Sequence, residues 1–443
     1  MIKVVHLTRY CHVAGYGGTE RYVLDLIGEL RSLGVEGSIA WLCQDRDISP
    51  FESEGIRIIP IHAPRAELDP FDPGLVKRAV AAICTEGAPS LMHVHTLGIA
   101  ETEIARALSA SGVPYAFTFH SPAWTCRRHT LLRWGRVPCD GEIRTVRCSA
   151  CKLHERSGLG PALAVLGALA SAPLVYSLPS LGRTSFRRRT MFTADTYHFR
   201  RACRRFLQAC GLVVSCCDWS APLLRLNGAR ADRILACPQG VSRKFVPAAD
   251  AVRKRSSIAE GNLFTIGYVG RVAAVKGVDI VIRAVRRIEC ERLRMQIIGW
   301  KDTARDSYAK QVKRMADEDK RIELVAPLAH DDMIARYGDL SLVVIPSVWR
   351  ETGPLVLFEA LQTGVPVWTS RNMGQQELVE AQGRVIEPNT VDRWQSALQE
   401  AVDLFRRGQW SGRRVREQHV RTMADVAREM RNAYERLCAR AVR

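Results

Sequence analysis

Residues 351–367 read ETGPLVLFEALQTGVPV and set two glutamates eight positions apart across a Gly-Pro step. Pro354 suits the first turn of a helix, because its fixed φ and missing N–H cost nothing there. Gly364, followed by a Val-Pro pair, is typical of a helix end. We therefore expect a helix that begins near Gly353 or Pro354 and ends at Gly364.

The stretch before it, LSLVVIPSVW over residues 340–349, is typical of a buried strand that runs into a loop. Glu351 is therefore predicted at a strand-to-helix turn on the carboxyl edge of a sheet. The helix start from Gly353 to Leu355 offers backbone N–H groups to an anion such as phosphate. Glu359, deeper in the helix, is placed to accept hydrogen bonds from the two hydroxyls of a ribose.

The rest of the chain repeats a pattern of strand, loop and helix, which favours parallel sheets with helices on both faces. A charged stretch over 246–262 separates two series of strands. We predict an α/β protein with two Rossmann-like, doubly wound domains, 1–248 and 262–412, that face each other across a ligand-binding cleft. The predicted strands are 2–7, 37–42, 91–94, 115–119 and 212–215, then 264–269, 295–298, 322–325 and 342–345, with a helix over 21–33.

Composition and charge limit the function. The 443 residues are 47% hydrophobic and 25% charged, as in a folded two-domain protein. A net charge of +18 favours anionic partners such as nucleic acid, anionic lipid or phosphorylated substrates. No aromatic ladder or zinc-finger spacing accompanies the arginine runs, so nucleic acid is the least favoured of these. Residues 413–443 predict a basic helix whose apolar seam packs on the body of the protein.

The start of the chain bears on its location. MIKVVHLTRY lacks the apolar core of a signal peptide and favours a reducing cytoplasm. Peripheral attachment to the inner face of a membrane stays an open alternative. Most of the 14 cysteines are then expected to be buried small hydrophobes.

Four cysteines depart from that expectation, because they lie within 26 residues of an insert over about 124–205. Four thiolates form a closed tetrahedral zinc site, and a C-x2-C pair is a common half of one. A structural zinc, unlinked cysteines, an iron–sulfur cluster and disulfides all stay open. His129 and His154 are further candidate ligands. The four cysteines are Cys126, Cys139, Cys148 and Cys151.

The insert also carries an uncharged stretch over 159–182, followed by an arginine run. Its length would allow a membrane span, but Pro173 and Pro179 interrupt it. An element at an anionic membrane surface, or beside a lipid-linked acceptor, is one alternative. A helix pair buried on the first domain is the other.

Several segments resemble one enzyme family. ETGPLVLFE matches the E-x7-E motif of the retaining glycosyltransferases of GT-B fold, in the GT4-like group 1 family. GRVAAVKG, with Arg271 and Lys276, resembles that family's diphosphate-binding loop, and GGTERYVLDL, with Gly17 and Gly18, resembles its N-terminal glycine loop. FTFHSP, with His120 at the end of a strand, resembles its histidine site. The segments follow the family's order along nearly the whole chain, which makes the set specific.

The resemblance implies transfer of a sugar from a nucleoside diphosphate sugar to a glycan or lipid-linked acceptor, with retention of configuration. A UDP-sugar is the favoured donor and a GDP-sugar the next, in synthesis of a surface polysaccharide or glycolipid. Glu351 would bind the sugar hydroxyls and Glu359 the ribose, while His120 would lie beside the donor sugar. Gly17 and Gly18 would let the backbone approach phosphate or acceptor. The sequence does not define an oligomeric state.

The residue types agree with this chemistry. Negative charge develops on the leaving diphosphate, and two fixed cations, Arg271 and Lys276, would stabilise it. With both present, no divalent metal is needed for catalysis. The resemblance implies that the leaving phosphate helps to deprotonate the acceptor, so no side chain is assigned as the base.

Other interpretations stay open. The two glutamates and the Arg271 and Lys276 pair could be ordinary surface charges, His120 a core histidine, and Gly17 and Gly18 a tight turn. At the level of function, one rival is a nucleotide-sugar 2-epimerase of GT-B fold. The other is a non-catalytic, membrane-associated protein that binds a nucleotide sugar.

Overall fold

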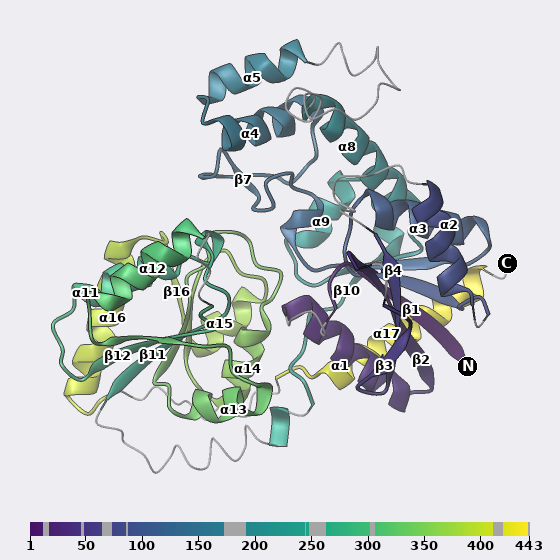
Figure 1. Cartoon of the computed structure of the whole chain (residues 1–443). Helices are drawn as coiled ribbons and strands as arrows, with labels where there is room; N and C mark the ends of the chain where they lie inside the picture. Colours follow the sequence, from purple (N-terminus) through teal and green to yellow (C-terminus); the bar gives the residue numbers. More distant parts are fainter. Residues whose placement is uncertain are drawn as a thin grey trace. The chain divides into compact units, whose positions relative to one another are not determined.

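The computed structural model describes residues 1–11, 17–45, 48–63, 73–85, 87–171, 192–243, 245–247, 263–301, 306–410 and 420–441. They form two compact units (Figure 1). The first unit comprises Met1–Pro238 together with Val426–Arg443, and the second comprises Gln239–Asp425.

The first unit is built on an eight-stranded sheet in the order β10-β9-β6-β5-β1-β2-β4-β3. The edge strand β3 is antiparallel to β4, and the other pairs are parallel. The strands are β1 (Ile2–Thr8), β2 (Val35–Cys43), β3 (Phe51–Ser53), β4 (Ile56–His62), β5 (Leu91–Val94), β6 (Tyr115–Phe119), β9 (Leu212–Ser215) and β10 (Ile234–Ala236).

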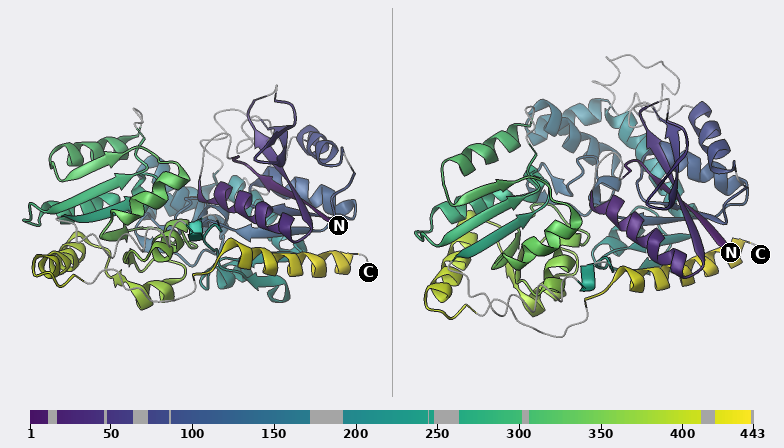
Figure 2. Two further views of the ribbon diagram at one scale, coloured as in Figure 1. Left: turned by 90° about the horizontal axis from the view of Figure 1, so that it is seen from below. Right: turned by 60° about the horizontal axis from the view of Figure 1, so that its bottom comes forward.

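Helices cover both faces of this sheet (Figure 2). On one face, Leu7 and Phe117 pack in a core with α2, α3 and α8. On the other, Ile27 of α1 packs so closely over Gly37 of β2 that a Cβ there would need to displace it. The helices of the unit are α1 (Gly18–Ser32), α2 (Pro73–Ile83), α3 (Ile99–Ala110), α4 (Thr145–Ser157), α5 (Pro161–Ala170), α8 (Phe192–Ala209), α9 (Ser220–Leu226) and α17 (Met423–Ala441).

The second unit has a six-stranded, wholly parallel sheet in the order β13-β12-β11-β14-β15-β16. One face packs on α11, α12 and α16, and the other on α13, α14 and α15. The strands are β11 (Phe264–Val269), β12 (Leu293–Ile298), β13 (Ile322–Val325), β14 (Leu342–Ile345), β15 (Val367–Ser370) and β16 (Arg384–Ile386). The helices are α11 (Val278–Arg286), α12 (Ser307–Asp317), α13 (His330–Gly338), α14 (Leu355–Thr363), α15 (Gln376–Gln382) and α16 (Val391–Arg406).

The predicted fold class is confirmed, because each unit is a mostly parallel sheet with helices on both faces. The strand predictions agree with β1, β2, β5, β6, β9, β11, β12, β13 and β14 to within two residues at each end. Two details differ from expectation. Pro354 is the N-cap of α14 rather than its first helical residue, and α17 begins at Met423.

The apolar seam predicted for the C-terminal helix is buried at Val420, Met423, Ala427, Met430, Tyr434 and Leu437. From Val426 onward α17 belongs to the first unit, and Figure 2 shows it alongside the first sheet. The Tyr434 hydroxyl lies 2.6 Å from Nδ1 of His93 on β5.

The described part of the apolar stretch forms α5. Ala164 and Ala168 of α5 are buried, whereas Leu163 and Leu166 are 58% and 61% exposed. Residues 172–191, which hold the rest of the stretch and the start of the arginine run, lie outside the described residues. Among the described helices, none is both long and apolar enough to span a bilayer.

Candidate active site

A lysine and a glutamate from two loops meet at the carboxyl edge of the second sheet. Lys276 follows β11 and Glu351 follows β14, and these strands are neighbours. Nζ and Oε1 form an ion pair at 2.7 Å, with the side chains 19% and 7% exposed. The strand order runs in opposite directions from β11 and β14, and ligands of doubly wound sheets bind at such a switch point. The pair therefore lies where this fold binds its ligand.

The backbone holds the two loops together. The Val348 N–H donates to the carbonyl of Val275 over 2.9 Å. Gly277 has a φ of 66°, and a Cβ there would collide with the carbonyl of Pro346, so the turn requires glycine. Nδ2 of Asn389 also donates a hydrogen bond to the Pro346 carbonyl, over 3.0 Å. Lys276 is thus carried on a fixed turn.

Glu351 is buried as an anion with three donors on one oxygen. Its Oε1 accepts from Lys276, from the Ser347 hydroxyl at 2.6 Å and from the Trp349 indole at 2.7 Å. Burial by itself would raise the pKa of Glu351, but the charge of Lys276 and the three hydrogen bonds outweigh it and lower the pKa. Glu351 is therefore a pure acceptor at neutral pH.

The second glutamate of the pair lies on α14. Glu359 is partly exposed, and its Oε2 accepts a hydrogen bond from the buried Tyr337 hydroxyl at 2.8 Å. No side chain caps the start of α14, whose N-cap is Pro354. The first-turn amides of this helix are thus available to an anion. Gly364 ends α14 with a φ of 76°, as the sequence predicts.

The remaining donor-side residues surround this pair. Gly353 is buried with a φ of 121°, and a Cβ there would collide with the Gln375 side chain. Leu355 is half-buried at the start of α14. The Arg271 side chain is exposed, while its carbonyl accepts from the Tyr268 hydroxyl at 2.6 Å. The structure therefore joins Lys276 to Glu351 and leaves the Arg271 guanidinium toward solvent.

His120 lies at the carboxyl end of β6 in the first unit and is 8% exposed. Its ring packs edge-on against Tyr22 of α1, with centroids 4.8 Å apart. Its Nε2 lies 3.0 Å from Nδ1 of His95, and Nε2 of His95 lies 2.9 Å from Nδ1 of His6. Three imidazoles therefore form a buried hydrogen-bonded chain that ends at His120.

These histidines are neutral in the folded protein. Burial lowers the pKa of His6 and of His120 to about 3, and it lowers the pKa of His95 and His93 as well. A neutral imidazole has one N–H, so each hydrogen bond of the chain fixes the tautomer of the next ring. The chain thus orients His120 without placing a charge there.

Gly17 and Gly18 begin α1, after residues 12–16 that lie outside the described range. Gly17 is the N-cap, is half-buried and has an extended φ of −131°. Gly18 is exposed, and a Cβ there would meet nothing within 4 Å. Within the described residues, packing therefore does not explain the glycine at position 18.

Cysteine burial follows the expectation, since nine of the fourteen are buried. Cys126, Cys139, Cys148 and Cys151 line one pocket in the first unit. They are separate from the residues around Glu351, which belong to the second unit.

Several residues of these sites were not singled out by the sequence patterns. They are the donors to Glu351 and Glu359 and the histidines behind His120. The S-x-W spacing before Glu351 and the H-x-H at the end of β5 could have indicated some of them. The residues are Ser347, Trp349, Tyr337, His6, His93 and His95.

Two family models match the chain. The model described as Glycosyl transferase 4-like domain matches residues 17–151, and the model described as Glycosyl transferases group 1 matches residues 264–403. Together they cover more than half of the chain.

The chain is also similar to curated proteins. It is 26% identical over 247 residues to the D-inositol 3-phosphate glycosyltransferase of Corynebacterium aurimucosum, which is 52% of this chain and 58% of that protein. The enzyme of the same name from Mycobacterium tuberculosis is 25% identical over 199 residues, or 44% of this chain and 41% of that protein. The chain thus spans about half the length of the curated relatives it matches.

Solved structures share the fold along the whole chain. Sucrose-phosphate synthase from Thermosynechococcus elongatus has a TM-score of 0.69 at 17% identity, covering 99% of this chain and 100% of that one. Anabaena HepE in complex with UDP-glucose has a TM-score of 0.60 at 14% identity, covering 100% and 98%. With two family models in the expected order and the fold of these enzymes, the chain belongs to the GT4-like group 1 glycosyltransferases of GT-B fold.

Proposed function

We propose that this protein transfers a sugar from a nucleoside diphosphate sugar to a glycan or lipid-linked acceptor, with retention of anomeric configuration. The observation that carries the proposal is the Lys276–Glu351 ion pair beside the start of α14, at the switch point between β11 and β14. Synthesis of a surface polysaccharide or glycolipid is the proposed setting.

The donor is proposed to be a UDP-sugar, with a GDP-sugar as the next candidate. Anabaena HepE was solved with UDP and with UDP-glucose, and Arabidopsis starch synthase IV with ADP. These ligands belong to those proteins, but they support a nucleoside diphosphate as the donor class here.

The proposed chemistry begins with the leaving group. When the bond from the anomeric carbon to the diphosphate oxygen breaks, negative charge develops on the diphosphate. Lys276 and Arg271 stabilise that charge, one as a point charge and the other as a bidentate fork. The backbone N–H groups of Gly353 and Leu355, on either side of Pro354, contribute further donors. Because two cations fill this role, we expect transfer to proceed without a divalent metal.

Glu351 and Glu359 are proposed to hold the two sugars of the donor. Glu351 is ionised, so it accepts from hydroxyls of the transferred sugar and stabilises positive charge near its anomeric carbon. A diphosphate that takes Lys276 as a partner weakens that ion pair and releases a lone pair of Glu351 for the substrate. Glu359 accepts from the ribose hydroxyls while Tyr337 fixes its orientation.

His120 is proposed to hydrogen-bond the donor sugar as a neutral imidazole, with its tautomer set by His95 and His6. Gly17 and Gly18 are proposed to let the backbone approach phosphate or acceptor. The leaving phosphate, rather than a side chain, takes the proton of the acceptor hydroxyl. A lipid-linked acceptor would bring the protein to an anionic membrane surface, where the exposed leucines of α5 provide an apolar contact.

The test is nucleotide-dependent thermal stabilisation of the wild type, of Arg271→Ala and of Glu359→Ala, with UDP, GDP, ADP and TDP. A ligand at 100 times its dissociation constant adds about 2.7 kcal/mol to the free energy of unfolding. We expect UDP to raise the melting temperature of the wild type and both variants to lose the shift. Arg283→Ala, which removes an exposed arginine of α11, is the matched control and should keep it.

Donor turnover then separates the function classes. A glycosyltransferase consumes the UDP-sugar only when an acceptor is present, and the anomeric configuration of the product reports retention. Interconversion of the donor without acceptor would instead identify a 2-epimerase, and a shift without turnover a binding protein. No shift with any nucleotide, in the presence of acceptor lipid as well, would contradict the proposal.

A further inference from the structure

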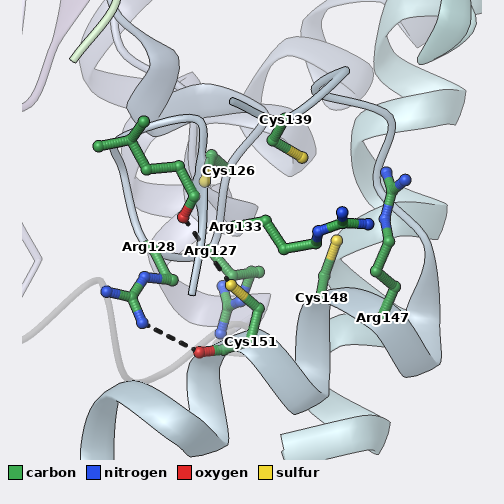
Figure 3. Close-up of a pocket in the computed structure, with 9 residues that line it drawn as sticks. Cys126, Arg127, Arg128, Arg133, Cys139, Arg147, Cys148 and Cys151 are labelled. Atoms are coloured by element: carbon green, nitrogen blue, oxygen red, sulfur yellow. Dashed lines mark hydrogen bonds between the residues drawn. The ribbon is translucent and has the colours of Figure 1, made fainter. Parts of the chain in front are cut away.

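Four cysteines outside the group of residues around Glu351 line a single pocket in the first unit (Figure 3). They come from three segments of the chain. Cys126 follows the short helix Pro122–Trp124, and Cys139 follows the strand Val137–Pro138. Cys148 and Cys151 lie on α4 with a spacing of three, so they share one face of the helix. The fold therefore brings all the cysteines of the C-x12-C-x8-C-x2-C pattern to one pocket.

Two of the sulfur atoms already accept backbone hydrogen bonds. The Trp134 N–H donates to Sγ of Cys151, and the Arg144 N–H donates to Sγ of Cys148, both over 3.3 Å. Donors of this kind orient metal ligands and stabilise the charge of a bound thiolate. The two N–H groups could act in the same way on thiolate ligands at Cys148 and Cys151.

The charge of the pocket complements an anionic metal centre. Zinc bound to four thiolates carries a net charge of −2. The pocket is lined by the four cysteines, by Leu132 and by four arginines, which Figure 3 shows around the sulfur atoms. Arginine stays protonated under all ordinary conditions, so its charge favours an anionic centre, although Arg147 is paired with Asp140 at 2.5 Å and Arg128 with Glu155 at 3.8 Å. The four arginines are Arg127, Arg128, Arg133 and Arg147.

Between Cys126 and Cys151, two residues, Leu131 and Ile143, belong to the main core of the first unit, and Ile143 also donates its N–H to Asn227 over 3.0 Å. His129, Leu131 and Trp134 have positive φ values of 66°, 54° and 57°, and such conformations persist only when the surroundings enforce them. The small local core consists of Ala150, Ala164 and Ala168. A segment with so few buried side chains gains stability from a cross-link, for which disulfides or a metal are the usual solutions in small folds.

We propose that Cys126, Cys139, Cys148 and Cys151 bind one structural zinc ion. Among the described residues, no three of these sulfurs lie within 4.8 Å of one another. Binding therefore draws them inward by rotation about Cα–Cβ, between staggered positions of each side chain. Each cysteine enters as a thiolate, so binding releases protons to solvent. His129 and His154 are not among the pocket-lining residues, and Nδ1 of His154 lies 2.6 Å from the Leu159 carbonyl.

The role of the ion follows from its place. It ties the segment after β6, which carries His120, to α4 and so to the base of α5. The proposal does not depend on sugar transfer, because the zinc ligands are separate from Lys276, Glu351 and Glu359, which belong to the second unit.

The first test is the metal content of the full-length wild type, purified without chelators and measured by plasma mass spectrometry. We expect about one zinc per chain, with neither iron nor acid-labile sulfide in matching amount. Cys148→Ser and Cys151→Ser should lose the zinc. Cys84→Ser, which removes a half-buried cysteine outside the pocket, should keep it.

The second test remains informative if a variant does not fold. Thiol alkylation of the native wild type should modify four fewer cysteines than alkylation after a chelator has removed the metal. Replacement of zinc by cobalt should give the strong visible absorption of a tetrahedral thiolate site. Wild-type protein with free thiols and no metal would overturn the proposal. So would iron with sulfide, or a mass lower by two hydrogens for each disulfide.

Discussion

Substitution of Lys276 tests the electrostatic interactions of the site, because Lys276 is the cationic partner of the buried Glu351. Lys276→Met leaves the Glu351 carboxylate buried with its cationic partner gone. Removal of one partner from a buried pair lowers the free energy of unfolding by about 3–5 kcal/mol. It should also raise the pKa of Glu351, so the loss becomes smaller as the pH falls and the carboxyl is protonated. Urea unfolding at several pH values measures both effects.

Arg271→Met is the control for that experiment. Its side chain is exposed, so its removal should change the free energy of unfolding by no more than about 0.5 kcal/mol. Addition of Glu351→Gln to Lys276→Met should restore most of the lost stability, because the uncompensated charge is gone. Equal stability of the two methionine variants would contradict the burial of the ion pair.

The buried histidines predict a steep dependence of stability on pH. The pKa of His6 is about 3 in the folded protein against an ordinary value of 6.5. Below pH 6.5, His6 binds a proton in the unfolded chain but not in the folded protein, so the free energy of unfolding falls as the pH drops. The slope is about 1.4 kcal/mol per pH unit for such a histidine. Above pH 6.5 neither state is protonated and the contribution is constant.

His6→Gln isolates this term, since glutamine keeps a hydrogen-bonding group toward His95 and never titrates. We expect the variant to lose stability less steeply than the wild type below pH 6.5 and to run parallel to it above. Urea unfolding across this range measures the difference. Identical slopes in both ranges would show that His6 titrates normally in the folded protein.

At this scale the sequence reveals residue types but not their partners. The motif names Lys276 and Glu351, yet their contact joins positions 75 apart in the chain. His6 and His95 are 89 apart, and Tyr434 reaches His93 over 341 positions. Local periodicity carries no information on such pairs, because the sheet order and not the spacing brings them together. Pairing therefore had to come from the structure.

At the scale of elements, the turn from β11 into α11 is sterically constrained. Gly277 and Gly408 have nearly the same φ, 66° and 67°, but a Cβ meets the Pro346 carbonyl at the first and nothing within 4 Å at the second. Gly408→Ala should therefore cost about 1 kcal/mol for backbone strain alone. Gly277→Ala should cost clearly more, because the loop that carries Lys276 must move.

Denaturant unfolding of the two alanine variants, together with UDP-dependent stabilisation, tests this prediction. Gly277→Ala should lose both stability and the UDP shift, whereas Gly408→Ala should keep the shift. An equal loss of unfolding free energy in the two variants would mean that the loop containing Pro346 can move without a loss of stability.

Strands such as β11 and β14 are predictable because short apolar runs with clear borders are typical of a parallel sheet. β4 was missed because Pro60 interrupts its apolar run, and β16 because it has three residues. The two ends of α14 were predictable, because Pro354 marks its start and Gly364 its end. The structure of the segment that carries the four cysteines was not predictable, because its two strands have only two residues each.

At the scale of the whole molecule, charge and apolar surface together predict binding to anionic bilayers. The chain has a net charge of +18, and the leucines of α5 are exposed. Leu163→Ser with Leu166→Ser should weaken binding to vesicles that contain anionic lipid by about tenfold or more. Leu226→Ser, which changes a leucine of α9 that is 51% exposed, is the matched control. Vesicle sedimentation measures the effect.

Two outcomes would count against this prediction. Binding that is equal on neutral vesicles, or unaffected by added salt, would exclude the electrostatic part. Equal weakening by Leu226→Ser would show that α5 is not the contact.

The return of α17 to the first unit has a consequence for the order of folding. The second unit is one continuous segment, Gln239–Asp425, whereas the first needs both Met1–Pro238 and Val426–Arg443. During synthesis, domains fold as their residues leave the ribosome. The second unit can therefore fold before the first unit is complete, because the first unit also needs the contact between Tyr434 and His93. A chain truncated after Asp425 should contain a protease-resistant second unit, whereas its first unit should still be digested.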